Sequence, residues 1–107
     1  MTDVVIVLST VPDDASAETL ARTLVEEKLA ACVNILPPMT SIYRWNGAVE
    51  LSQERQLAMK TTRQRVEALR ARLLGLHAYD LPEFLVVAVE EGSPEYLKCV
   101  VSETAGS

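Results

Sequence analysis

The sequence has few of the features that mark nucleic-acid-binding or membrane proteins. Its 107 residues carry 10 Lys and Arg against 15 Asp and Glu, a formal net charge of −5. Nucleic-acid binding requires a basic face to neutralise phosphates, so this charge argues against that function. No apolar run reaches the roughly 20 residues of a membrane helix. The apolar run at 4–8 is too short for a signal peptide, and no basic residue precedes it. We expect a cytoplasmic protein.

Cysteine, histidine and catalytic patterns are equally scarce. Cys32 and Cys99 lie far apart without CxxC spacing, so we expect two reduced cysteines, both buried as small apolar residues. His77 is the only histidine. The four glycines are scattered and form no phosphate-binding loop. No serine has an evident base partner, so the sequence does not predict an enzyme.

The dominant feature that is present is a long β-hairpin. Asn46-Gly47 separates two extended runs, 32–45 and 48–60, and this dipeptide favours the type I′ turn of a hairpin. Fully extended, the first arm would reach about 45 Å at about 3.3 Å per residue, whereas a domain of this size has a radius of gyration near 13 Å. The arm must therefore bend, at Pro37-Pro38, or leave the domain. We interpret the hairpin as an oligomerisation element.

The remaining elements complete a βαββαβ order within one domain, 1–107, with a short C-terminal helix. Apolar periodicity and capping residues predict these elements: a strand from 4, a helix from Asp13 or Asp14 to about Leu29, the two hairpin strands, a helix after Thr61 or Thr62 that ends near Gly75, a strand at 84–89, a helix capped by Ser93, and a frayed tail at 102–107. With right-handed crossovers this order predicts an α+β, ferredoxin-like sandwich.

Two positions in this sandwich do not suit a monomer. The strand at 84–89 is apolar throughout, yet it lies at an edge of the predicted sheet, where exposed strands invite aggregation. A neighbouring subunit under closed rotational symmetry would cover it. In the second hairpin strand, Gln53 and Arg55 occupy the apolar register. This break indicates a bulge, a twist or a segment outside the core.

Six stretches form an ordered set of motifs between about residues 4 and 100: Ser9-Thr10-Val11-Pro12, Leu29 to Ile35, Ser41 to Gly47, Glu54 to Thr61, His77 to Glu83, and Tyr96-Leu97. With these motifs the chain resembles the CutA family of divalent-cation tolerance proteins. The resemblance implies a homotrimer of ferredoxin-like subunits and a link to copper and other divalent ions. It also implies a likeness to the trimeric PII-type signalling proteins.

The sequence departs from the family pattern at positions that concern metal binding. His77-Ala78-Tyr79-Asp80 stands where His-Pro-Tyr-Glu is common, and Cys99 replaces a common tryptophan. Some members carry a cysteine at the position of Ser9 and a second histidine at that of Leu76, and both are implicated in copper binding there. Only His77 of that set is present in this sequence.

The candidate metal ligands are His77 and Cys32, because imidazole and thiolate both suit copper. The alternatives are a hydrogen-bonding loop histidine and a buried structural thiol. Asp80 and Glu83 would supply further oxygen donors to the His77 loop.

Other side chains suggest a pocket and an interface. We expect a pocket between subunits lined by Glu54, Lys60, Tyr79 and Glu83. Tyr43 and Trp45 share a face of the hairpin. They are candidate trimer-interface anchors, with lining of the same pocket as the alternative.

These observations lead to one expected function and one alternative. The first is a homotrimer that binds Cu(II) or another divalent cation, without an organic cofactor, in divalent-cation tolerance. The alternative is a PII-like regulatory trimer that binds a small metabolite or a partner protein at the clefts between subunits.

Overall fold

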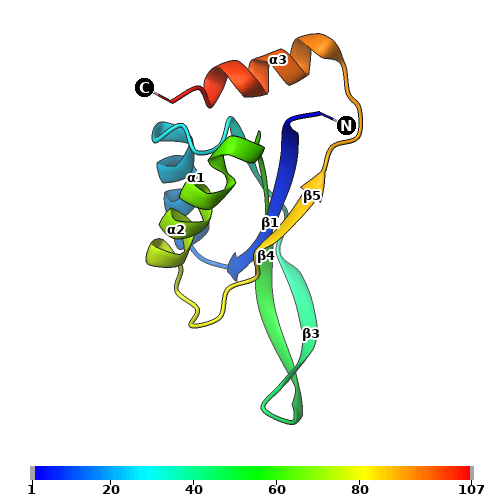
Figure 1. Ribbon diagram of the computed structural model, residues 1–107. Coiled ribbons are helices and arrows are strands. Elements are labelled where there is room, and N and C mark those ends of the chain that lie inside the picture. The colour runs from blue at the N-terminus through cyan, green and yellow to red at the C-terminus, as the bar shows by residue number, and fades with distance from the viewer. Residues whose placement is uncertain (1, 107) are drawn as a thin grey trace.

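The computed structural model describes residues 2–106 and has the α+β, ferredoxin-like architecture expected from the sequence. Figure 1 shows α1 and α2 on one face of an antiparallel sheet and α3 across one end. The sheet order is β2-β4-β1-β5, and β3 also pairs with β4. The elements are β1 Val4–Pro12, α1 Ser16–Glu26, β2 Cys32–Ile35, β3 Met39–Trp45, β4 Ala48–Thr62, a 3₁₀ turn Arg63–Arg65, α2 Val66–Leu76, β5 Leu85–Ala88 and α3 Pro94–Glu103.

The core lies between the sheet and the two helices α1 and α2. Alternate residues of β1 and β4 point into it, because successive strand side chains face opposite sides. The apolar stripes of the helices, at spacings of three and four residues, close it from the other side. Its fully buried members include Val5, Val7, Leu24, Leu57, Met59, Leu69 and Leu73.

The hairpin leaves the body of the domain, as its length predicts. Asn46 and Gly47 have φ of 50° and 79°, as a type I′ turn requires, and Trp45 pairs with Ala48 across it. The molecule is 44 Å long and 25 by 23 Å across, and Figure 1 shows β3 and the start of β4 projecting from one end. Gln53 is exposed in this projection, so the polar break in β4 marks a segment outside the core.

The bulge lies in the first arm of the hairpin, while β4 runs unbroken for 15 residues. Ile35 pairs with Leu57, whereas Met39 pairs with Glu54. The three residues 36–38, which include both prolines, therefore lie opposite only two residues of β4. One extra residue reverses which face each side chain takes. Tyr43 consequently lies opposite Glu50, on the same face of β4 as Glu54.

The edge strand β5 is apolar and open to solvent in the single chain, as expected. Leu85, Val86 and Val87 are 54%, 43% and 45% exposed. β5 pairs only with β1. One edge of its backbone is therefore unpaired among residues 2–106.

Several details of the sequence-based expectation are wrong. The residue before α1 is Ala15 rather than Asp13 or Asp14, and neither Thr61 nor Thr62 caps α2, because both lie in β4 and a 3₁₀ turn precedes the helix. Helix α1 ends at Glu26 rather than near Leu29, because Lys28 adopts a left-handed conformation with φ of 61°. Cys99 is exposed rather than buried, and Cys32 is only half-buried. The tail is ordered further than expected, since α3 continues to Glu103 and Thr104 is buried.

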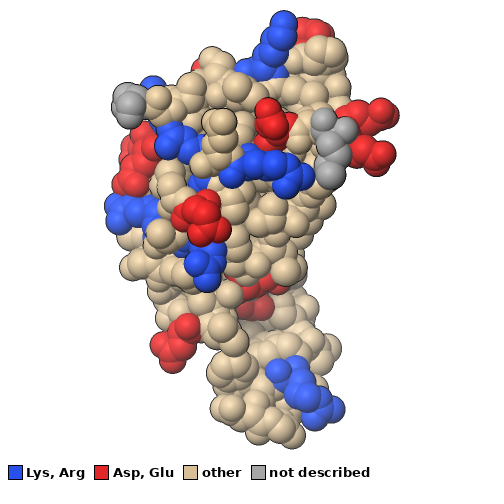
Figure 2. Space-filling view, viewed as in Figure 1, with Lys and Arg blue, Asp and Glu red and all other residues tan. Residues whose placement is uncertain are grey.

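The charged side chains form no continuous basic face in the view of Figure 2, where Lys and Arg alternate with Asp and Glu over the body. No helix formed by residues 2–106 combines the length and the apolar character needed to cross a membrane.

Candidate functional site

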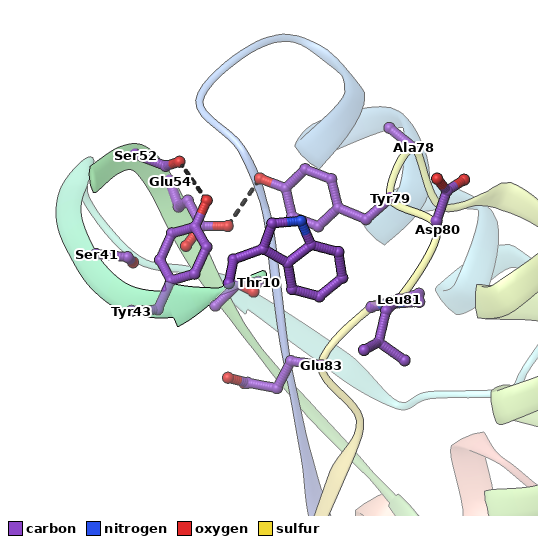
Figure 3. A pocket seen from close by; sticks show the side chains of 12 residues that line it. Thr10, Ser41, Tyr43, Ser52, Glu54, Ala78, Tyr79, Asp80, Leu81 and Glu83 are labelled. Carbon is purple, nitrogen blue, oxygen red and sulfur yellow. Dashed lines mark hydrogen bonds between the residues drawn. The ribbon is translucent and has the colours of Figure 1, made fainter. Parts of the chain in front are cut away.

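A pocket lies where the hairpin meets the loop between α2 and β5. Its volume is about 690 Å³. The base of the hairpin, the end of β1 and residues 78–83 form its walls (Figure 3). The lining residues are Thr10, Ser41, Tyr43, Trp45, Ser52, Glu54, Ala78, Tyr79, Asp80, Leu81, Pro82 and Glu83.

Glu54 and Tyr79 form the polar centre of this pocket. Glu54 is only 8% exposed, and the Tyr79 hydroxyl donates a hydrogen bond of 2.7 Å to its Oε2 (Figure 3). Burial raises the pKa of Tyr79 well above its ordinary value, and the bond to Glu54 raises this pKa further. Tyr79 therefore stays a neutral donor to Glu54 throughout the neutral and moderately alkaline range.

Tyr43 and Trp45 form the hairpin wall of the pocket. Both belong to β3 and are 41% and 47% exposed. Tyr43 Oη lies 2.9 Å from Ser52 Oγ, on the neighbouring strand. In Figure 3 Tyr43 and Tyr79 lie on either side of the Glu54 carboxylate. The structure thus supports the alternative expectation for these two aromatics, that they line the pocket. Their interface role stays a prediction.

His77 fixes the start of the loop that carries Tyr79. Its Nε2 lies 2.7 Å from the Thr10 carbonyl oxygen, which can only accept, so Nε2 carries the proton. Its Nδ1 accepts a 3.0 Å hydrogen bond from the Tyr79 backbone N–H. Both ring nitrogens are engaged, as expected of a hydrogen-bonding loop residue. Metal binding by His77 requires one of these bonds to break.

Glu83 closes the other end of the loop through Gln56. The Gln56 amide donates to Glu83 Oε2 at 2.8 Å and to the Ser9 carbonyl oxygen at 3.0 Å. Sequence analysis missed Gln56 as a site residue. Its position two residues after Glu54 is a usable signal, because residues two apart in a strand share a face.

Lys60 and Cys32 lie apart from this pocket. Lys60 Nζ is 4.0 Å from Cys32 Sγ and 6.0 Å from the centre of the Tyr96 ring. Lys60 lies six positions beyond Glu54 in the same extended strand, about 20 Å away at about 3.3 Å per residue. Within one chain the structure therefore brings together Glu54, Tyr79 and Glu83 of the predicted set but not Lys60.

The predicted metal ligands do not form a site within one chain. No group of three or more His, Cys, Asp or Glu side chains among residues 2–106 is placed to hold a metal ion. Tight metal sites collect three or four such donors. The donor set of a single chain consequently does not fit a tightly bound metal ion.

Comparison with known proteins gives a consistent match over nearly the whole chain. The family model described as CutA1 divalent ion tolerance protein matches residues 5–103. The divalent-cation tolerance protein CutA of Thermus thermophilus is 50% identical over 92 residues, which span 86% of this chain and 89% of that protein.

Solved structures extend this match to the fold. CutA from Xylella fastidiosa superposes with a TM-score of 0.93 at 48% identity, covering 96% of this chain and 99% of that one. CutA1 from Oryza sativa gives 0.94 at 35% identity, covering 99% and 97%.

Proposed function

The chain belongs to the CutA1 divalent ion tolerance protein family, and on that basis we propose that it acts in divalent-cation tolerance as a cytoplasmic homotrimer that binds Cu(II) or another divalent ion. The observation that carries this proposal is the family match over residues 5–103, from β1 to the end of α3. The family is named for tolerance rather than for a reaction, so we propose binding and not catalysis as the activity.

Exposed apolar surface supports the oligomeric part of the proposal. On the hairpin face opposite the pocket, Ile42, Val49 and Leu51 are 69%, 66% and 64% exposed. We call these three residues the hairpin patch. Apolar patches of this kind commonly mark interfaces. Together with the open strand β5 they offer two separate surfaces for neighbours, as a closed ring of like subunits requires.

The metal-binding part of the proposal calls for donors from more than one subunit. A single chain offers no group of three donors within residues 2–106, and its His77 already uses both ring nitrogens. Half-buried Cys32 supplies a thiol of the kind that copper favours. Binding shared between subunits would be weak in the monomer and stronger in the trimer.

Calorimetric titration with Cu(II) tests this function. We expect saturable binding by wild type, with the heat reduced in His77→Ala and Cys32→Ser. The matched control is Cys99→Ser, which removes the exposed cysteine and should bind like wild type. Equal binding by all four proteins would remove both His77 and Cys32 as ligands, and no binding by wild type would overturn the metal proposal.

The pocket favours a second candidate function, a regulatory trimer that binds a small molecule. A volume of about 690 Å³ falls within the range of about 300–1,000 Å³ typical of small-molecule sites. Native mass spectrometry of freshly purified protein would reveal a retained molecule and count the subunits. A monomer mass would contradict both candidate functions.

A further inference from the structure

We propose that the pocket at the base of the hairpin binds a small organic ammonium ion, a protonated or quaternary amine with an apolar body. The proposal rests on the small-molecule function above and is independent of divalent-cation binding. It follows from three properties of the pocket: the sign of its charge, its aromatic walls and its size.

The charged groups of the pocket are all acidic. Glu54, Asp80 and Glu83 line it, and none of the twelve lining residues is Lys or Arg. Glu54 is more than nine-tenths buried. Its Oε2 receives the Tyr79 hydroxyl, and Glu54 belongs to none of the ion pairs found among residues 2–106. A buried carboxylate is costly unless it is paired, and a positively charged ligand would supply the pairing.

The aromatic walls suit the same ligand. Tyr43 and Trp45 come from β3 and Tyr79 from the loop, and the two tyrosines flank Glu54 (Figure 3). An ammonium group is attracted to the faces of such rings. Leu81 and Pro82 add apolar surface to the lining, which would contact the hydrocarbon part of the molecule.

The size of the pocket favours an organic cation over a bare metal ion. The carboxylates are spread over about 690 Å³, and no three of the His, Cys, Asp and Glu side chains in residues 2–106 converge on one point. A metal ion needs convergent donors, whereas an organic cation can meet separated carboxylates and rings at once. Anionic metabolites are disfavoured because the lining offers no basic side chain to receive them.

The experiment uses Trp45, the only tryptophan of the chain, as a reporter inside the pocket. The assembled wild-type protein is titrated with three probes of similar shape: cyclohexylmethylamine, cyclohexylmethanol and cyclohexanecarboxylate. Trp45 fluorescence and calorimetric heat are both recorded at neutral pH. We expect saturable binding of the amine, at least about tenfold tighter than the alcohol, and no binding of the carboxylate. Trimethyl(cyclohexylmethyl)ammonium then shows whether the ligand must donate N–H bonds.

Two variants assign the binding to this pocket. Glu54→Gln retains an oxygen that can accept from Tyr79, and it should weaken amine binding by about tenfold or more. Asp80→Asn changes a carboxylate for which the structure shows no hydrogen bond, and it should weaken binding as well. The matched control is Glu95→Gln, an exposed residue of helix α3 outside the lining, which should bind like wild type.

The outcomes separate this proposal from the divalent-cation function. Equal binding of amine and alcohol, no binding of either, or unchanged binding by Glu54→Gln and Asp80→Asn would overturn the ammonium site. None of these results alters the Cu(II) titration. Conversely, a failed Cu(II) titration with tight amine binding would leave the ammonium site standing alone.

Discussion

At the scale of single residues, Tyr79 has the most consequential contacts. Its hydroxyl bonds to buried Glu54, and its backbone N–H bonds to His77. One residue thereby ties the loop 77–84 both to β4 and, through His77, to the Thr10 carbonyl at the end of β1. Polar bonds hold the first part of this loop, and Leu81 is 72% exposed, whereas Phe84 at the end of the loop packs against the core.

Removing the Tyr79 hydroxyl should destabilise the protein more than removing that of Tyr43. In Tyr79→Phe the buried Glu54 carboxylate loses its hydrogen bond, which costs about 1–3 kcal/mol. Tyr43→Phe deletes the same atom from an exposed bond to Ser52 and should cost about 0.5 kcal/mol or less. Chemical denaturation at one fixed protein concentration measures both. Equal losses would show that the buried Tyr79–Glu54 bond adds no more stability than the exposed Tyr43–Ser52 bond.

The same pair of proteins tests the pH dependence. An unfolded tyrosine ionises near pH 10, and folding raises the pKa of Tyr79 above that value. The stability that Tyr79 contributes is therefore complete below about pH 10 and is lost as the pH rises through the folded-state pKa. The difference in absorbance at 295 nm between wild type and Tyr79→Phe should rise with a midpoint above 10. A midpoint at or below 10 would contradict the assignment.

At the scale of elements, the hairpin presents two different faces. One carries Tyr43 and Trp45 into the pocket, and the other exposes the hairpin patch. The sequence places all of these residues correctly in strands, because Asn46-Gly47 and the alternation are local signals. Leu51 and its neighbours escaped notice as interface candidates, since an exposed apolar side chain has the same sequence pattern as a buried one.

We expect Leu51→Asp to weaken assembly without unfolding the subunit. Burying a leucine side chain at an interface contributes about 1.5–3 kcal/mol, so the substitution should raise the dissociation concentration by at least about tenfold. Sedimentation velocity over a dilution series measures this. The control is Leu74→Asp, on helix α2 and 39% exposed. If both variants assemble alike, the hairpin patch is not an interface.

The elements also show where prediction from the sequence ends. Periodicity and caps give the order of strands and helices, and Ser93 caps α3 as predicted by accepting from the Tyr96 N–H. Glu54 lies beside Tyr79 rather than beside Lys60 because of the position that the loop 77–84 takes against the sheet. The sequence of this loop shows no periodicity from which that position could be predicted. Two hydrogen bonds fix that position, one from His77 to the Thr10 carbonyl oxygen and one from Gln56 to Glu83. Each joins residues at least 27 positions apart, so no local sequence pattern predicts it.

At the scale of the whole molecule, the open edge of β5 is the surface on which the proposed assembly depends. Three of its four side chains, Leu85 to Val87, are large, apolar and about half exposed. A short apolar strand is a poor edge for a monomer, so we expect a neighbouring chain of the proposed trimer to cover it.

Hydrogen exchange tests this cover directly. In wild type at high concentration, the β5 amides that do not bond to β1 should exchange at least about tenfold more slowly than those of the loop 90–93, because a neighbouring chain pairs with them. The amides of helix α1 provide an internal reference for a folded element. If the outer β5 amides exchange as fast as the loop, the edge is free in solution.

At the bulge, residues 36–38, the number of residues is more constrained than their identities. β2 and the type I′ turn each fix a register against β4, and the two registers differ by one residue. Substitutions at 36–38 leave that difference intact. A one-residue deletion would remove the extra residue and make the two registers agree. Tyr43 would still pair with Glu50, but the ladder would become regular and lose the bend and added twist of the bulge. Across related sequences, the distance from Cys32 to Asn46 should therefore vary less than the identities of the residues between them.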